Sequence, residues 1–295
     1  MKWVINKDYA GRRIRDFLRE EQSFSRRILK SIRNEGGNVY INGSKRQLND
    51  RLSLSDVLTV QFPPEKKGPF MRPEHLPLKI VYEDEAILVI DKRAGMATIP
   101  SIHHPSQTVA NAVLAYYERR NIPFTVHIVT RLDRETSGLV LVAKHRYSHS
   151  LLSMEQINGS IERGYDAIVE GVLEQPAGVI DAPIGRKEGS IIERTVRADG
   201  KKAITHYETV QQTKTHSLIN VKPETGRTHQ IRVHFSFIGH PLAGDDLYGG
   251  SRDIINRQAL HCSTIRFLHP LTKKRMEFHA SLPNDMTGLF SDLIQ

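Results

Sequence analysis

The nine residues 130–138, TRLDRETSG, hold the side chains best suited to chemistry. Asp133 lies between Arg131 and Arg134, and the segment runs directly into the apolar stretch Leu139–Ala143, which predicts a buried strand. A neighbouring cation favours the ionised form of a carboxylate, which can then act as a nucleophile or as an electrostatic stabiliser. A lone loop aspartate is also common as a cap or in a surface ion pair, so these residues alone leave both roles open.

Other chemistry-bearing motifs are absent from the sequence. It contains no Gly-x-Gly-x-x-Gly, P-loop, His-Glu-x-x-His or Gly-x-Ser-x-Gly pattern, which disfavours nucleotide-cofactor enzymes, P-loop NTPases and α/β-hydrolases. The single cysteine, Cys262, excludes an intramolecular disulfide framework and a cysteine-rich zinc site, and we expect it to be buried. We therefore expect no cofactor and no metal, although 14 histidines leave a site of scattered histidines open.

Composition predicts a globular protein of the reducing cytoplasm. The chain is 39% hydrophobic and 25% charged, and its longest apolar runs, Ala86–Ile90 and Leu139–Ala143, are far shorter than a membrane span. The first residues also lack the apolar core of a secretory signal. We expect no membrane partner.

Positive charge is concentrated near the N-terminus. The chain has a net charge of +9, and residues 1–78 hold 16 of its 42 Lys and Arg but only 9 of its 33 Asp and Glu. Such an excess is typical of a protein that binds a polyanion, and its uneven distribution indicates a separate basic module.

The elements predicted for that module are two helices and a small sheet. Ile14, Phe17 and Leu18 have helical spacing, as do Ile28 and Ile32. Strands are expected at 38–41 and 57–62, with a turn at 42–43. The Pro-rich, Gly-rich and charged stretch that follows indicates a mobile linker. We therefore divide the chain into residues 1–63, a linker at 64–77 and a larger domain at 78–295.

The larger domain is predicted to be α+β, on a largely antiparallel mixed sheet. Strands outnumber helices there and come in hairpin pairs. Strands are expected at 79–82, 86–90, 139–143, 165–169, 203–210, 217–221, 260–267 and 275–280, and helices at 108–117, 145–157 and 228–238.

The N-terminal module resembles the S4-like RNA-binding domain. The shared features are the helix segment FSRRILKSIR, the hairpin VYING and the strand segment SDVL, with Ser55 where that family usually has glycine. This resemblance implies phosphate contacts, which would supply affinity rather than sequence readout. The residues implied are Arg26, Arg27, Lys30, Lys45 and Arg46.

The larger domain resembles the RluA/RluD family of RNA pseudouridine synthases. Residues 131–144, RLDRETSGLVLVAK, match the family signature, although Thr130 replaces the usual histidine. Four further stretches also match the family, and all of the motifs occur in the family order along the chain. These stretches are DKRAGM (91–96), RGYDAIVEG (163–171), KPETGRTHQIRVH (222–234) and PLAGDDLYG (241–249). The resemblance implies a pseudouridine synthase fold and the isomerisation of uridine in structured RNA.

The resemblance also implies roles for particular residues. Asp133 would be the catalytic carboxylate, Arg227 the basic partner that orients it and keeps it charged, and Tyr165 the ring that stacks on the uracil. Arg131 would fill the space that the uridine leaves on flipping out of the RNA, and Ile231 would be an apolar wall. The reaction needs no redox cofactor and no ATP, because only the hydrogen on C5 leaves.

Two other functions remain open at this point. One is an RNA-binding protein or RNA chaperone that keeps the fold without activity. The other is a hydrolase of a glycosidic bond, which would require two placed carboxylates, and Glu135 is the only near neighbour of Asp133. For the RNA partner we expect ribosomal RNA of the large subunit first and transfer RNA second. We expect a monomer, since one catalytic domain supplies the implied site.

Overall fold

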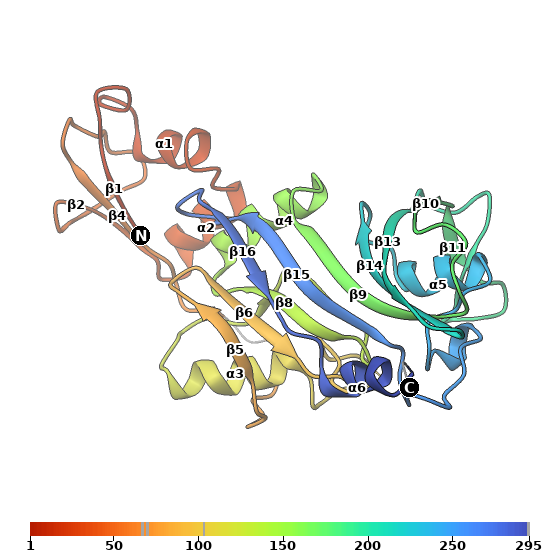
Figure 1. The fold of residues 1–295 in the computed structure, drawn as a ribbon. Helices are drawn as coiled ribbons and strands as arrows, with labels where there is room; N and C mark the ends of the chain where they lie inside the picture. The colour runs from red at the N-terminus through yellow and green to blue at the C-terminus, as the bar shows by residue number, and fades with distance from the viewer. Residues whose placement is uncertain (66–67, 69–70, 103, 294–295) are drawn as a thin grey trace.

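The computed structural model describes residues 1–65, 68, 71–102 and 104–293, and these form a four-stranded sheet, a ten-stranded sheet and a two-stranded hairpin. We call residues 1–63 the N-terminal unit. It lies beyond one end of the large sheet that the rest of the chain builds (Figure 1).

The N-terminal unit packs two short helices against a four-stranded antiparallel sheet. Its elements include the expected helices and strands and add two strands at its edges. One face of each helix is buried because its apolar residues recur at helical spacing. The elements are β1 (Lys2–Val4), α1 (Ile14–Glu20), α2 (Arg26–Asn34), β2 (Asn38–Ile41), β3 (Ser44–Arg46) and β4 (Val57–Gln61), in the sheet order β1-β4-β2-β3.

The rest of the described chain builds one curved ten-stranded sheet, so the predicted α+β class is confirmed. Its strands are β5 (Lys79–Glu83), β6 (Ile87–Lys92), β7 (His127–Ile128), β8 (Ser137–Ala143), β9 (Glu162–Glu170), β10 (Ala177–Asp181), β13 (Ile204–Gln212), β14 (His216–Pro223), β15 (Leu260–Leu268) and β16 (Arg275–His279). The main path runs β10-β13-β14-β9-β15-β8-β6-β5, with β16 beside β15 and β7 beside β8. All described pairings are antiparallel except that of β8 with β15.

Helices and one small hairpin complete this part of the chain. These elements are α3 (Val109–Arg119), α4 (Arg146–Ile157), β11 (Ile184–Arg186), β12 (Arg194–Val196), α5 (Gln230–Phe237), the 3₁₀ turn η1 (Asp246–Tyr248) and α6 (Asn284–Leu293). Every element predicted after residue 78 is present, with bounds shifted by a few residues. The short strands β7, β10, β11 and β12, the turn η1 and the last helix were not predicted.

Strand β8 is the centre of the core and begins where the Asp133 loop ends. All seven of its residues are buried, which explains its continuous apolar sequence. At Gly138 the backbone has φ of +108°, and a Cβ there would collide with the backbone of Cys262 on the parallel neighbour β15. Only glycine satisfies both conditions. The packing of β8 on β15 therefore fixes the position of the loop that precedes it.

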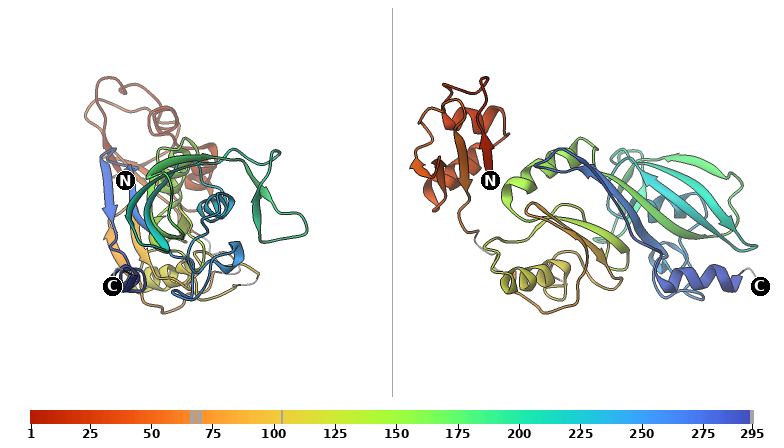
Figure 2. Two further views of the ribbon diagram at one scale, coloured as in Figure 1. Left: turned by 45° about the vertical axis from the view of Figure 1, so that its right-hand side comes forward. Right: turned by 60° about the vertical axis from the view of Figure 1, so that its left-hand side comes forward.

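The N-terminal unit is docked onto α4. Tyr147 and Leu151 of that helix belong to the hydrophobic core of the N-terminal unit. The Tyr147 ring lies 4.2 Å from the ring of Phe24, and its hydroxyl donates to the carbonyl of Gln22. The two larger sheets are thus joined through shared side chains, and the N-terminal unit lies at one end of the large sheet (Figure 2, right).

The connecting segment is anchored at Glu65, in contrast to the mobile linker that its composition predicts. The buried Glu65 carboxylate lies 2.5 Å from His127 Nε2 and accepts hydrogen bonds from the backbone N–H groups of Thr125 and Arg146. A buried carboxylate requires such partners, and here every partner belongs to the second part of the chain. Residues 66–67 and 69–70 lie outside the described residues. None of the described helices is long and apolar enough to cross a membrane.

We expect acid to weaken the start of α4 through His145. Its Nδ1 caps the helix by accepting from the N–H of Ser148, and burial lowers the pKa of His145 to about 4. Because this pKa is below that of an unfolded histidine, stability is complete above about pH 6.5 and falls as pH drops towards 4. The expected loss is about 2 kcal/mol at pH 5, measured by urea unfolding. A His145→Asn variant keeps a capping acceptor and should lose less, while exposed His75→Asn should behave as the wild type. Equal losses in all three proteins would contradict this assignment.

Candidate active site

A pocket of about 630 Å³ opens beside the loop that precedes β8. Its volume is within the usual range for small-molecule sites. Asp133 is the one carboxylate among the described residues that line it, whereas arginines are numerous. The arginines are Arg131, Arg134, Arg163, Arg227 and Arg232. The arginines make the pocket suited to an anionic substrate, and Asp133 places a single carboxylate among them.

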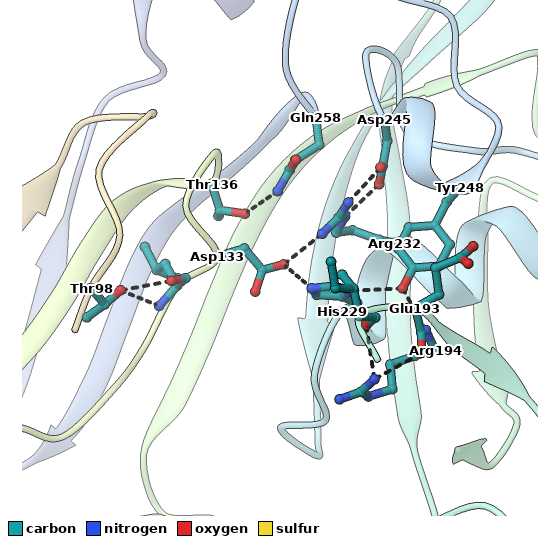
Figure 3. Close-up of polar contacts among 12 residues, drawn as sticks. Thr98, Asp133, Thr136, Glu193, Arg194, His229, Arg232, Asp245, Tyr248 and Gln258 are labelled. Atoms are coloured by element: carbon teal, nitrogen blue, oxygen red, sulfur yellow. Dashed lines mark hydrogen bonds and ion pairs between the residues drawn. The ribbon is translucent and has the colours of Figure 1, made fainter. Parts of the chain in front are cut away.

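The Asp133 side chain is held by two residues from the 229–232 segment. Its Oδ2 accepts a hydrogen bond from Arg232 Nη1 at 3.2 Å and lies 3.8 Å from His229 Nε2 (Figure 3). The side chain remains 31% exposed. One side of the carboxylate is thus fixed by cationic and polar groups, while the other remains open to a substrate.

Arg232 is a buried bridge between two carboxylates. Its Nε and Nη2 each donate to Asp245 at 2.7 Å, and its guanidinium lies 4.9 Å from the centre of the Tyr248 ring. Asp245 is 1% exposed, so its charge requires this partner. Burial opposes the charge on Arg232, but its hydrogen bonds to Asp245 and Asp133 raise its pKa. The bidentate contact fixes the guanidinium plane and directs its third nitrogen at Asp133.

His229 is the N-cap of α5, the helix that carries Arg232, and its backbone conformation is unusual. Its φ of 58° is left-handed, and this turn starts α5. The Tyr248 hydroxyl accepts from the N–H of Arg194, so its own proton is free to go to His229 Nδ1, 2.7 Å away. Burial lowers the pKa of His229, which favours the neutral ring. With Nδ1 accepting from Tyr248, the ring hydrogen is on Nε2, towards Asp133.

Arg227 does not make the contact that the resemblance implies. It lies at the pocket edge, exposed, and its Nε donates to the carbonyl of Lys202 at 2.9 Å. The expectation that Arg227 orients Asp133 is therefore wrong, because Arg232 holds that position. The reason is the turn at His229: Arg227 precedes it in a loop, whereas Arg232 follows it on the helix face that meets the Asp133 loop.

Tyr165 is in the pocket, as expected, and is buried on β9. Burial raises its pKa, so the phenol is neutral at physiological pH. Ile231 also lines the pocket, while Arg131 is exposed at its edge. The structure thus gathers Asp133, Tyr165 and Arg131 around one space, and the sequence motifs indicated each of them.

The backbone of the Asp133 loop is held by Lys92, which lies in the motif DKRAGM, and by Thr98, which the sequence analysis did not single out. The buried Lys92 ammonium donates to the carbonyls of Met96 and Arg134 at 2.8 and 3.0 Å. The Thr98 hydroxyl donates to the carbonyl of Leu132 and accepts from its N–H. These bonds hold the backbone on both sides of Asp133.

Thr130, where the resembled family has histidine, is fully buried. Its hydroxyl oxygen accepts from the N–H of Leu141 in β8 at 2.9 Å. In this chain the position therefore anchors the loop to the central strand and does not face the substrate space.

Most of the predicted RNA-contacting residues of the N-terminal unit share one groove. Arg26, Lys30, Lys45 and Arg46 line it, together with Arg15, Arg19 and Arg33. Arg27 is exposed but is not among the lining residues. Across the described residues, no group of three or more His, Cys, Asp or Glu is placed to hold a metal ion.

Comparison with known sequences gives one family. The family model described as "RNA pseudouridylate synthase" matches residues 86–237. The chain is 48% identical to "Uncharacterized RNA pseudouridine synthase YjbO" of Bacillus subtilis (strain 168), over 96% of this chain and 97% of that one. It is 39% identical to "Ribosomal large subunit pseudouridine synthase D" of Pseudomonas aeruginosa, over 88% of this chain and 85% of the relative.

Solved structures show the same fold. The chain is similar to "Human RNA Pseudouridylate Synthase Domain Containing 4", with a TM-score of 0.60 and 20% identity, over 73% of this chain and 93% of that one. It is also similar to "Human RNA Pseudouridylate Synthase Domain Containing 1", with a TM-score of 0.58 and 22% identity, over 78% and 98% of the two chains. The expected fold is confirmed.

We expect Asp245→Asn to slow catalysis although Asp245 is remote from the substrate space. The change removes the charge that fixes Arg232, so the Asp133 carboxylate loses its orientation, and such misplacement costs up to about 100-fold in rate. The measurement is the single-turnover rate of uridine isomerisation at saturating RNA. The matched control is Asp246→Asn, which removes an exposed carboxylate paired with Arg252 and should leave the rate unchanged. An unchanged rate in Asp245→Asn, with unchanged stability, would contradict the positioning role.

Proposed function

The chain belongs to the RNA pseudouridylate synthase family, and from this premise we propose that it isomerises uridine in ribosomal RNA of the large subunit, with Asp133 as the catalytic carboxylate. The family and the enzyme class expected from the motifs are confirmed by the comparisons. The roles of individual residues and the identity of the RNA are our proposals.

The observation that supports Asp133 most strongly is that it is the single carboxylate among the described residues of an arginine-rich pocket. A glycosidic-bond hydrolase would require a second placed carboxylate. Glu135, its nearest acidic neighbour in sequence, lies outside the lining and pairs with Arg134 at 3.4 Å. The pocket therefore favours the isomerase over the hydrolase.

The geometry suits a reaction in which the base leaves the ribose and returns. The N1–C1′ bond breaks, the uracil turns, a C5–C1′ bond forms, the C5 hydrogen leaves as a proton, and N1 takes up a proton. We propose that the open side of the Asp133 carboxylate faces the ribose, where it stabilises or traps the electron-poor sugar or promotes loss of its C2′ proton. Neutral Tyr165 supplies a ring for the uracil to stack on. Arg232 and His229 hold the carboxylate throughout.

The alternative of an inactive RNA-binding protein is disfavoured by the same network. Arg232 bonds to both Asp245 and Asp133, and His229 bonds to Tyr248 and lies 3.8 Å from Asp133. Both contacts are with Oδ2 of Asp133, and no described residue forms a hydrogen bond or ion pair with its other oxygen. A buried ion-pair network of this kind is costly to keep without a function.

Ribosomal RNA is favoured by the names of relatives. Several are "Ribosomal large subunit pseudouridine synthase D", at 36–41% identity. We propose large-subunit ribosomal RNA as the substrate, with transfer RNA as the second choice. We also propose that the protein is a monomer, because residues of one chain complete the pocket. We propose that it acts in the cytoplasm.

The test of the catalytic proposal is tritium release from RNA labelled at uridine C5. Wild-type protein should release tritium from unmodified ribosomal RNA, and Asp133→Asn should release none while its affinity for RNA changes only a few-fold. Retained turnover in Asp133→Asn would remove Asp133 from its role. Release of free uracil would favour the hydrolase, and release from transfer RNA alone would overturn the choice of substrate.

The N-terminal groove is expected to add salt-dependent affinity. We propose that Arg26, Lys30 and Lys45 contact phosphates, because no carboxylate within the described residues forms an ion pair with them. Changing all three to Gln should reduce the slope of log affinity against log salt by about 2–3, at roughly 0.7–0.9 for each phosphate that is no longer neutralised. The measurement is a salt titration of binding to a ribosomal RNA fragment. An unchanged slope would contradict the proposal. Deletion of the unit is less informative, because it would expose Tyr147 and Leu151.

A further inference from the structure

A second hollow, of about 390 Å³, adjoins the candidate active site. The two spaces share Gly226, Arg227 and Thr228 as lining residues, so they are contiguous. The far wall of the second hollow is built by the β11–β12 hairpin and the segment 199–201.

Positive charge in this hollow is not neutralised by the protein. Within the described residues, Arg186, Lys201 and Arg227 make no ion pair with a carboxylate. Asp199 is the one carboxylate among the described lining residues, and it pairs with Arg197. Glu193, on the hairpin, pairs with Lys187. A concave surface with unpaired cations attracts an anionic ligand.

The hollow is also rigid. Ile184 and Lys201 exchange two backbone hydrogen bonds of 2.9 Å, and Arg197 donates to the carbonyl of Arg186. The N–H of Arg194 donates to the Tyr248 hydroxyl, which connects the hairpin to His229 and so to the Asp133 network. The backbone positions that carry Arg186 and Lys201 are therefore fixed relative to the Asp133 network.

The loop of the hairpin adds an apolar surface next to these cations. Ile191 is 73% exposed and Ile192 is 57% exposed, although both are large hydrophobic residues. The hairpin projects from the body of the protein (Figure 2, left). An exposed apolar pair beside a basic hollow is suited to contact a nucleobase while the hollow binds the neighbouring phosphate.

We propose that this hollow is a phosphate-binding subsite for the RNA strand that flanks the target uridine on one side, with the Ile191–Ile192 tip against a neighbouring base. The inference rests on the proposed function and extends it to the substrate: the RNA must present an accessible strand beyond the uridine that enters the pocket. Arg227 thereby has a place at the junction of the two spaces instead of beside Asp133.

The experiment compares two double variants that remove the same net charge. Arg186→Gln with Lys201→Gln should raise the Kd for a ribosomal RNA fragment about tenfold and reduce the salt slope by about 1.4–1.8. The control, Lys214→Gln with Lys274→Gln, removes exposed cations away from both spaces and should change neither quantity. A Kd and slope equal to those of the wild type, or equal effects in the control, would overturn the subsite.

A second arm tests the apolar tip and the side of the strand. The double variant Ile191→Ser with Ile192→Ser should weaken RNA binding a few-fold. The salt slope should not change, because every cation that meets a phosphate is still present. Unchanged affinity would remove the tip from the interface. The RNA is trimmed up to the target uridine on its 5′ side in one substrate and on its 3′ side in another. One of these two trims should abolish the difference in affinity between the wild type and Arg186→Gln/Lys201→Gln. A difference that survives both trims would overturn the proposed placement. Tritium release by the wild type is measured separately, so failure of the isomerase proposal is distinguishable from failure of the subsite.

Discussion

The active-site geometry depends on one buried guanidinium. Arg232 makes a bidentate contact with Asp245, which has almost no access to water, and uses its remaining nitrogen to hold Asp133. The buried charge of Asp245 requires this partner, because an unpaired charge at that depth is costly, whereas the partly exposed Asp133 depends on Arg232 for its orientation. The left-handed turn at His229 and the helix that follows serve to bring this side chain to the Asp133 loop.

Local sequence patterns were sufficient for most of the elements and for the position of the Asp133 loop. The apolar run of β8 indicated a buried strand, and the polar residues before it indicated the loop that carries Asp133. They were insufficient for Arg232, since Arg227 and Arg232 occur in one motif and only the turn between them decides which reaches Asp133. Asp245, more than a hundred residues from Asp133, meets the site through tertiary packing alone.

The same limit applies to the connection between the two sheets. Proline, glycine and charge at 63–73 indicate a flexible segment, but composition does not show that Glu65 enters a buried site with His127 or that Tyr147 completes the other core. Short strands such as β10 and β12 were missed because their residues carry little periodicity, and their pairing with other strands creates them.

The docking of the N-terminal unit on α4 has a consequence for how substrates are chosen. With Tyr147 and Leu151 in the core of that unit, its basic groove and the Asp133 pocket belong to one body with a set span between them. An RNA that reaches both must carry its uridine at the matching distance from a backbone elsewhere in its tertiary structure. If the groove binds phosphates as proposed, the span between the two sites would select RNAs by their three-dimensional shape more than by their base sequence.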